Sequence, residues 1–233
     1  MTDVATGADS GGRIALSGLR GYLLRVYNYM AAGLALTGLV AYYGAASGFY
    51  AVVAGTPWFW LVLLAPLALV LLLGFRITRI SLGAAQLSFW AYAALVGLSL
   101  SGVCLAYTGE SIARVFFVSA GTFAATSLYG YTTQADLSRF GSFLFMGLIG
   151  IVVAMLVNMF LKTSALQLTV SVLGVFVFMG LTAYDTQRIR NLYIAGEGVI
   201  AAGKKAILGA LTLYLDFLNL FLMLLRLIGD RRQ

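Results

Sequence analysis

An aspartate in the middle of a long apolar run is the first residue of this sequence whose presence calls for a chemical explanation. Residues 210–226 are almost wholly hydrophobic, yet they contain Asp216 and, one turn later, Asn219. A charged side chain at the centre of a membrane-spanning helix costs about 2.5 to 3.5 kcal/mol or more, and such residues usually face a bundle interior or a watered cavity. Thr212, Asp216 and Asn219 follow at steps of four and three, so they share one helical face. We predict that this face carries the function; the alternative is a structural acid that a neighbouring helix satisfies.

A second acid lies in the preceding apolar run. Thr182, Asp185 and Arg188 follow at steps of three, again on one face. Two interpretations of Asp185 stay open on spacing alone. It is either a functional acid or the partner of Arg188 in an ion pair at the membrane interface.

Composition identifies the class of protein that must position these acids. Of 233 residues, 61% are hydrophobic and only 10% are charged, against about 25% charged in soluble domains. The chain is therefore an integral membrane protein in a lipid bilayer, and at about 20 to 25 residues per span its length allows seven helices. The net charge of +7 is dispersed between apolar runs, so we expect no nucleic-acid partner.

The residues that many enzymes need are missing. The sequence has no histidine and one cysteine, Cys104, inside an apolar run. Ser-His-Asp and Cys-His catalysis and the usual zinc sites are therefore excluded, and we expect neither an enzyme nor a tightly bound cofactor. An intramembrane aspartyl protease also uses two membrane aspartates, but Asp216 lies in Tyr-Leu-Asp-Phe, which lacks the Gly-x-Gly-Asp element that such a site needs.

The apolar runs predict an all-α membrane protein. Residues 1–20 are expected to form a disordered N-terminal tail and residues 21–233 a seven-helix transmembrane domain. A charge-free linker is expected over residues 47–56, and a polar loop over 191–203. The expected spans cover residues 26–46, 57–76, 82–106, 112–133, 140–161, 166–189 and 206–228.

The distribution of Lys and Arg predicts the orientation. With the N-terminus inside, ten of these residues lie on inside segments and five on outside segments, which favours a cytoplasmic N-terminus. Three of those five, however, are Arg226, Arg231 and Arg232 in the C-terminal tail. Either this tail is an exception to the rule, or the last helix does not cross fully.

Polar residues of the fourth run form one more aligned face. Ser119, Thr122, Thr126, Tyr129 and Thr133 follow at steps of three and four. Two explanations are left open. The hydroxyls bond back to their own helix, or they form a wall of a hydrated path.

Several segments together resemble the transmembrane Bax inhibitor motif family, and in particular a bacterial member. The segment 213–221, Leu-Tyr-Leu-Asp-Phe-Leu-Asn-Leu-Phe, is similar to the signature helix of that family, and Ala183-Tyr-Asp-Thr-Gln-Arg-Ile189 is similar to its sixth-helix motif. Residues 129–138 with Gly141, and Asn158 with Phe160, resemble its fourth-to-fifth connection and the end of its fifth helix. The resemblance extends over about residues 20–230.

This resemblance implies a fold and a function. The fold is a seven-helix bundle with the last helix at its centre. The function is a pH-sensitive leak for calcium, in which Asp185 and Asp216 share a proton, close the path and contact the ion transiently. A basic latch at the inner end of the second helix corresponds to Arg79, or to Arg76 next to it. Thr182, Thr212 and Asn219 are the residues that we expect to line the path.

The family resemblance also suggests an alternative function. Some bacterial relatives are associated with a non-conducting role, as a membrane regulator or scaffold that modulates a membrane partner such as a quality-control protease. We therefore expect calcium ions and protons as the partners of a channel, and a membrane protein as the partner of a scaffold. The expected location is the bacterial inner membrane.

Overall fold

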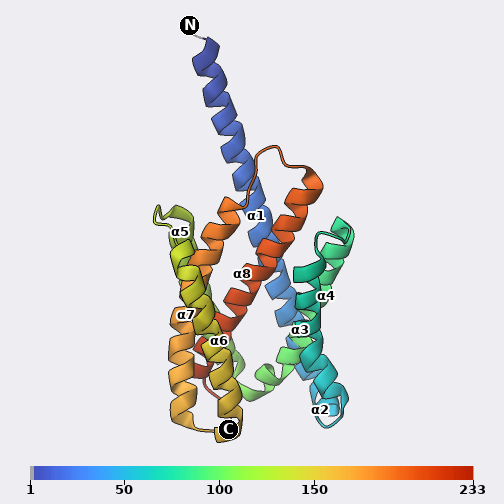
Figure 1. Cartoon of the computed structure of the whole chain (residues 1–233). Coiled ribbons are helices and arrows are strands. Elements are labelled where there is room, and N and C mark those ends of the chain that lie inside the picture. The colour runs from blue at the N-terminus through green and yellow to red at the C-terminus, as the bar shows by residue number, and fades with distance from the viewer. Residues whose placement is uncertain (1–2, 233) are drawn as a thin grey trace.

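The structure is a computed structural model that describes the backbone of residues 3–232 and the side chains of residues 17–232. Over this part of the chain it contains eight helices and no strand (Figure 1). The helices are α1 (Asp3–Ala46), α2 (Phe49–Ala54), α3 (Trp58–Arg76), α4 (Leu82–Ala106), α5 (Gly109–Thr132), α6 (Ser138–Leu161), α7 (Ser164–Asn191) and α8 (Val199–Ile228).

Seven of these helices are long and apolar enough to cross a membrane, which confirms the predicted all-α class. The spanning part of α1 is Ser17–Ala46, and the other six are α3 to α8. The predicted tail over residues 1–20 lies mostly outside the residues whose side chains are described, and it stays a prediction.

Two connections differ from the sequence-based expectation. The predicted linker over 47–56 contains the short helix α2, because six apolar residues between Gly48 and Gly55 can form a turn and a half of helix. Gly48 has φ 74°, a left-handed conformation that glycine adopts without strain. The predicted loop over 191–203 is shorter, because α8 already begins at Val199.

The last helix, α8, lies at the centre of the bundle. It packs against α7, α1, α5 and α4, and it crosses the bundle obliquely (Figure 1). Two thirds of its most apolar stretch are buried, against 6% for α3 and α6. The predicted position of the seventh span is therefore confirmed.

The other helices form two groups on either side of α8. One group contains α1, α2, α3 and α4, and the other contains α5, α6 and α7 (Figure 1). Each group holds together by its own contacts, and α8 contacts both. Large apolar side chains of the peripheral helices point outward, as lipid-facing residues do.

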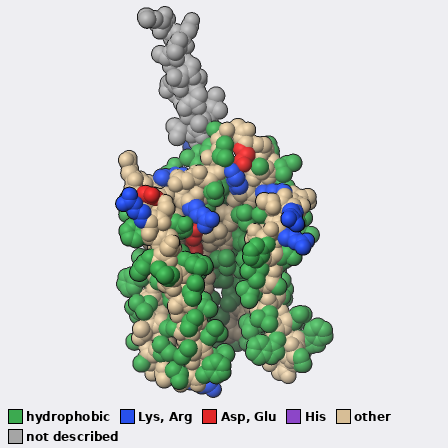
Figure 2. Space-filling view, in the orientation of Figure 1, with side chains coloured by type: hydrophobic (Ala, Val, Ile, Leu, Met, Phe, Trp, Pro, Cys, Tyr) green, Lys and Arg blue, Asp and Glu red, His purple; other side chains and the backbone are tan. Residues whose placement is uncertain are grey.

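Basic side chains gather at the end of the bundle where α8 begins, above a belt of hydrophobic side chains (Figure 2). We call this the basic end. It holds nine described Lys and Arg residues, at positions 20, 25, 76, 79, 139, 188, 190, 204 and 205.

Helix α8 runs the full length of the bundle, so the C-terminal tail lies at the opposite end. There Asp230 pairs with Arg114 at 2.6 Å, and the guanidinium of Arg231 lies over the Tyr107 ring at 5.8 Å. Backbone bonds also join Thr108 to Asp230 and Arg232 to Ala106. The basic tail therefore lies at the end of the bundle that holds fewer basic residues, and these contacts fix it to the α4–α5 corner.

Candidate functional site

A cavity of about 480 Å³ opens between α6, α7 and α8 near the basic end. Its polar lining comes mainly from α7 and α8, and Phe145, Leu148 and Phe178 are among its apolar walls. In Figure 2 an acidic side chain is visible just below the basic side chains on this side of the bundle. The polar residues that line the cavity are Ser142, Tyr184, Asp185, Arg188, Thr212, Asp216 and Asn219.

Asp185 and Asp216 meet in this cavity. The two carboxyl groups lie within hydrogen-bonding reach of each other, although the residues come from different helices. Asp185 is 8% exposed and Asp216 is 5% exposed. The Oδ2 atom of Asp216 is buried without a hydrogen-bond partner. Two carboxyl groups can bond directly only when one of them is protonated, because an ionised carboxylate has no hydrogen to donate.

The ion-pair interpretation of Asp185 is not supported. Within residues 17–232 the ion pairs are Lys205–Glu197 and Arg114–Asp230, and Asp185 takes part in neither. Arg188 lies close enough to attract Asp185 electrostatically and lines the mouth of the same cavity. Asp216 is thus the direct partner of Asp185, and Arg188 is a neighbour.

The oblique path of α8 explains how the two acids reach the same depth. If both helices stood upright, Asp216 would lie about 16 Å below Lys205 and Asp185 about 5 Å below Arg188. Because α8 is tilted, each of its residues descends less than in an upright helix (Figure 1).

Each residue of the 184–187 segment contacts a different element. Tyr184 packs over Gly141 at the start of α6, Asp185 meets α8, and the Thr186 hydroxyl bonds to Ser127 of α5 at 3.0 Å. Gln187 binds the α5–α6 loop twice. It donates to the Ala135 carbonyl at 2.8 Å and accepts from the Leu137 amide at 2.9 Å. Tyr184, Thr186 and Gln187 therefore hold this turn of α7 against α6, α5 and the loop between them, while Asp185 faces α8.

A close approach of α5 to α7 adds to this positioning. Gly130 of α5 lies so near Ala183 that an added Cβ would come 2.1 Å from the Ala183 carbonyl oxygen.

A second hydrogen-bond chain fixes the opposite side of α8. The Tyr214 hydroxyl lies 2.7 Å from Thr37 of α1, which donates to the Ala93 carbonyl of α4 at 2.9 Å. The helix that carries Asp216 is thus tied to both helix groups.

The predicted path-lining residues divide into two sets. Thr212 and Asn219 line the cavity beside Asp216, and the Asn219 amide donates to its own helix at Leu215. Thr182 is fully buried and donates to the Phe178 carbonyl at 2.7 Å, away from the cavity lining. The side-chain oxygens near the acid pair therefore come from α8.

The structure does not bring the proposed latch to the acid pair. Arg76 ends α3 and Arg79 lies in the following turn, and both are exposed. Within residues 17–232 neither side chain has a hydrogen bond or an ion pair, and neither lines the cavity. Instead, Lys204 of α8 donates to the Thr78 carbonyl in the same turn at 3.2 Å. The latch stays a prediction.

On the polar face of α5, the hydroxyls whose bonds are found bond back to their own helix, which was the first of the two explanations. Ser119 donates to Val115 at 2.8 Å, and Thr122 and Thr126 donate to carbonyls one turn earlier at 2.9 Å. None of these three residues lines the cavity of the acid pair. Their hydroxyls are used within their own helix.

Two polar residues of the cavity, Ser142 and Tyr184, were not predicted from the sequence. Tyr184 directly precedes Asp185, and its ring packs over Gly141. The glycine at position 141, which leaves room for that ring, was the feature of the sequence that could have indicated this contact. Ser142 follows that glycine and had no signal of its own.

Several known proteins are similar to this chain over most of its length. The inner membrane protein YbhL of Escherichia coli is 50% identical over 220 residues, which cover 93% of this chain and 94% of that protein. The uncharacterized protein RP147 of Rickettsia prowazekii is 49% identical over 218 residues, covering 93% and 92%. A protein of Deinococcus radiodurans is 46% identical over 221 residues, covering 94% of each. The model of the family described as inhibitor of apoptosis-promoting Bax1 matches residues 19–233, and the chain therefore belongs to this Bax inhibitor family of integral membrane proteins.

Proposed function

We propose that this protein is a pH-sensitive, calcium-permeable leak channel that the Asp185–Asp216 pair closes by sharing a proton. The observation that carries the proposal is the direct contact of two buried carboxyl groups from two helices in a cavity near the basic end. With the proton in place, the bond joins α7 to α8. When it leaves, two negative charges face each other in a poorly solvated site, where they repel and attract a divalent cation.

The oxygen atoms around the acid pair suit a calcium ion that binds only transiently. Calcium takes six to eight oxygen ligands. Two carboxylates supply at most four oxygens, and Thr212, Asn219 and water would complete the shell. In a conducting path, binding must be favourable enough for entry and weak enough for exit. A site with two acids at the wall of an open cavity meets both requirements.

The proposed orientation places the basic end in the cytoplasm. That end holds nine described Lys and Arg residues, and the opposite end holds five, at positions 114, 162, 226, 231 and 232. The excess favours a cytoplasmic N-terminus by the positive-inside rule. The cavity of the acid pair then opens toward the cytoplasm. The name of the Escherichia coli relative suggests the inner membrane as the location.

A flux measurement tests the channel proposal. Purified protein in liposomes that contain a calcium dye would be compared with Asp185→Asn and Asp216→Asn between about pH 5 and about pH 8. Wild-type influx should rise with pH as the shared proton leaves. Each asparagine variant should lose most of this dependence, because an amide cannot titrate. Thr122→Val, which changes a hydroxyl that bonds within α5, is the matched control. Influx that ignores both pH and the asparagine substitutions refutes the proposal.

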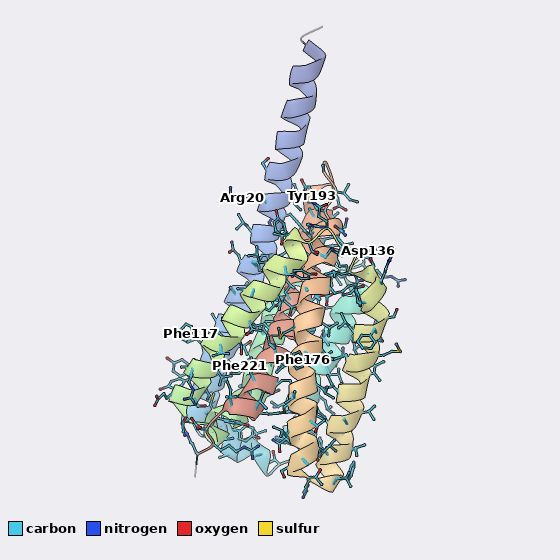
Figure 3. All side chains as sticks on the ribbon, turned by 90° about the vertical axis from the view of Figure 1, so that its left-hand side faces the viewer. Arg20, Phe117, Asp136, Phe176, Tyr193 and Phe221 are labelled. Atoms are coloured by element: carbon cyan, nitrogen blue, oxygen red, sulfur yellow. The ribbon has the colours of Figure 1, made fainter. Side chains whose placement is uncertain are left out.

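One observation favours the second candidate function, a membrane regulator that binds a protein partner. A groove of about 1240 Å³ runs between α1 and α5, floored by Phe217 of α8. Arg20 and Phe117, which both line it, are labelled on this flank in Figure 3. The groove offers a partner helix an apolar surface within the membrane. A stoichiometric partner crosslinked at Phe117, together with no calcium flux in liposomes, would favour this role over the channel.

A further inference from the structure

A second, smaller cavity lies at the opposite end of the same three helices. It has a volume of about 230 Å³ and lies between the end of α6, the start of α7 and the end of α8. Its polar lining is Asn158, Gln167 and Arg226. Each of these residues is two or three positions from the end of its helix. At 1.5 Å per residue the cavity is therefore within about 5 Å of the helix ends, at the depth of lipid head groups.

The charge in this cavity is uncompensated. Within residues 17–232, the Arg226 guanidinium has neither an ion pair nor a hydrogen bond. Of the acids at this end, Asp230 is paired with Arg114, and Glu110 does not line the cavity. Arg231 lies near enough to repel Arg226 and adds positive potential. An arginine at the wall of a cavity in such a field favours an anion from outside the chain.

Two amide groups add neutral donors beside this charge. Asn158 Oδ1 accepts from the Thr163 amide at 3.0 Å and from its hydroxyl at 3.3 Å, which orients the Nδ2 group away from this turn. Neither the Asn158 Nδ2 group nor the Gln167 side chain has a partner within residues 17–232. The cavity thus combines a planar fork of charged donors with two free amides.

We propose that the cavity of Asn158, Gln167 and Arg226 binds a phosphate oxyanion. Phosphate offers several acceptor oxygens, which matches a bidentate arginine with neutral donors on other helices. The apolar part of the lining, Met155, Met159 and Val170, suits the glycerol and first methylenes of a lipid. The phosphate is therefore either free or the head group of a phospholipid in the leaflet at this end of the bundle. The site assigns Arg226 to ligand binding, which accounts for one basic residue on the side that the charge rule disfavours.

Binding to the purified full-length chain in detergent tests this site. Inorganic phosphate would be titrated by calorimetry, and bound dihexanoyl phosphatidylglycerol would be counted by native mass spectrometry, with dihexanoylglycerol as the phosphate-free comparison. Arg226→Gln should weaken both phosphate ligands about tenfold or more, because it removes charge-assisted hydrogen bonds. Gln167→Leu should weaken them less and serves as the second variant if Arg226→Gln fails to fold. Arg232→Gln, which changes another arginine of the same tail, is the matched control.

Each outcome decides the proposal. Binding of the lipid and of phosphate, both lost in Arg226→Gln, supports a head-group site, and binding of phosphate alone supports a free anion. The proposal fails if dihexanoylglycerol binds as well as the phospholipid, or if neither phosphate ligand binds. It also fails if Arg232→Gln weakens binding as much as Arg226→Gln. The calcium proposal is independent of this result, since no flux is measured.

Discussion

Replacing Gly130 by alanine tests the positioning of Asp185 without touching either acid. An added Cβ at Gly130 would lie 2.1 Å from the Ala183 carbonyl oxygen and 2.8 Å from two further backbone atoms of that residue. Backbone atoms cannot rotate away as a side chain can, so α5 and α7 must move apart. We expect a cost of about 1 to 3 kcal/mol, the range for overpacked cores.

Gly121 of the same helix provides the matched control. It is exposed, and an added Cβ would meet nothing within 4 Å. Alanine there should stabilise α5 by about 0.5 to 1 kcal/mol, because glycine in a helix loses more conformational freedom on folding. The two variants have the same composition and differ only in what the methyl group meets. The expected difference in unfolding free energy between them is therefore about 1.5 to 4 kcal/mol.

The assay is detergent unfolding of the purified protein, with SDS titrated into mild micelles and helix content followed by circular dichroism. Gly130→Ala should unfold at a lower SDS fraction than the wild type, and Gly121→Ala at an equal or higher one. Gly130→Ala should also alter the pH dependence of calcium influx, because Ala183 lies two residues before Asp185. Equal unfolding midpoints for the two variants would refute the close packing of α5 on α7 and this explanation of how Asp185 is held.

Three further predictions follow from individual contacts. Tyr214→Phe should lower the unfolding free energy by about 1 kcal/mol, measured by the same SDS titration, because the Thr37 hydroxyl loses its bond to α8; an unchanged midpoint contradicts this. Gln187→Leu should make the loop over 133–137 exchange its amide hydrogens faster while α8 stays protected, because both side-chain bonds to that loop are lost; mass spectrometry of peptide exchange measures this, and unchanged loop exchange contradicts it. The Ser138 hydroxyl and amide hold the pKa of the exposed Asp136 carboxyl below its ordinary value. The stability that these hydrogen bonds give to the folded protein is therefore present at neutral pH and is lost as pH falls through this lowered pKa. The carbon-13 titration of Asp136 should therefore move to higher pH in Ser138→Ala, and an unshifted titration contradicts the assignment.

The sequence predicted the class of fold and the acid pair for identifiable reasons. Long apolar runs specify spanning helices through length alone, and each expected span lies largely within one of the helices. Asp216 was predicted to be a functional residue because burying a carboxylate in a membrane costs free energy. Its partnership with Asp185 came from the family resemblance, since spacing left Asp185 between a functional acid and an ion pair with Arg188.

Other features depend on tertiary geometry that spacing does not encode. The depth of Asp216 depends on the tilt of α8, which follows from its packing against four helices. Thr182 shares a helical face with Asp185, yet its hydroxyl bonds to Phe178. The cavity of Arg226 unites three helix ends that are separated by up to 68 residues in the chain, between Asn158 and Arg226.

The distance between the Asp185 and Asp216 carboxyl groups at two pH values tests the central claim most directly. Structures of the protein in lipid at about pH 5 and about pH 8 would provide it. Our account predicts a direct hydrogen bond at the lower pH, and at the higher pH a separation wide enough for water or a cation between the groups. The same hydrogen-bonded distance at both values, or carboxyl groups that are apart at the lower pH, would contradict it.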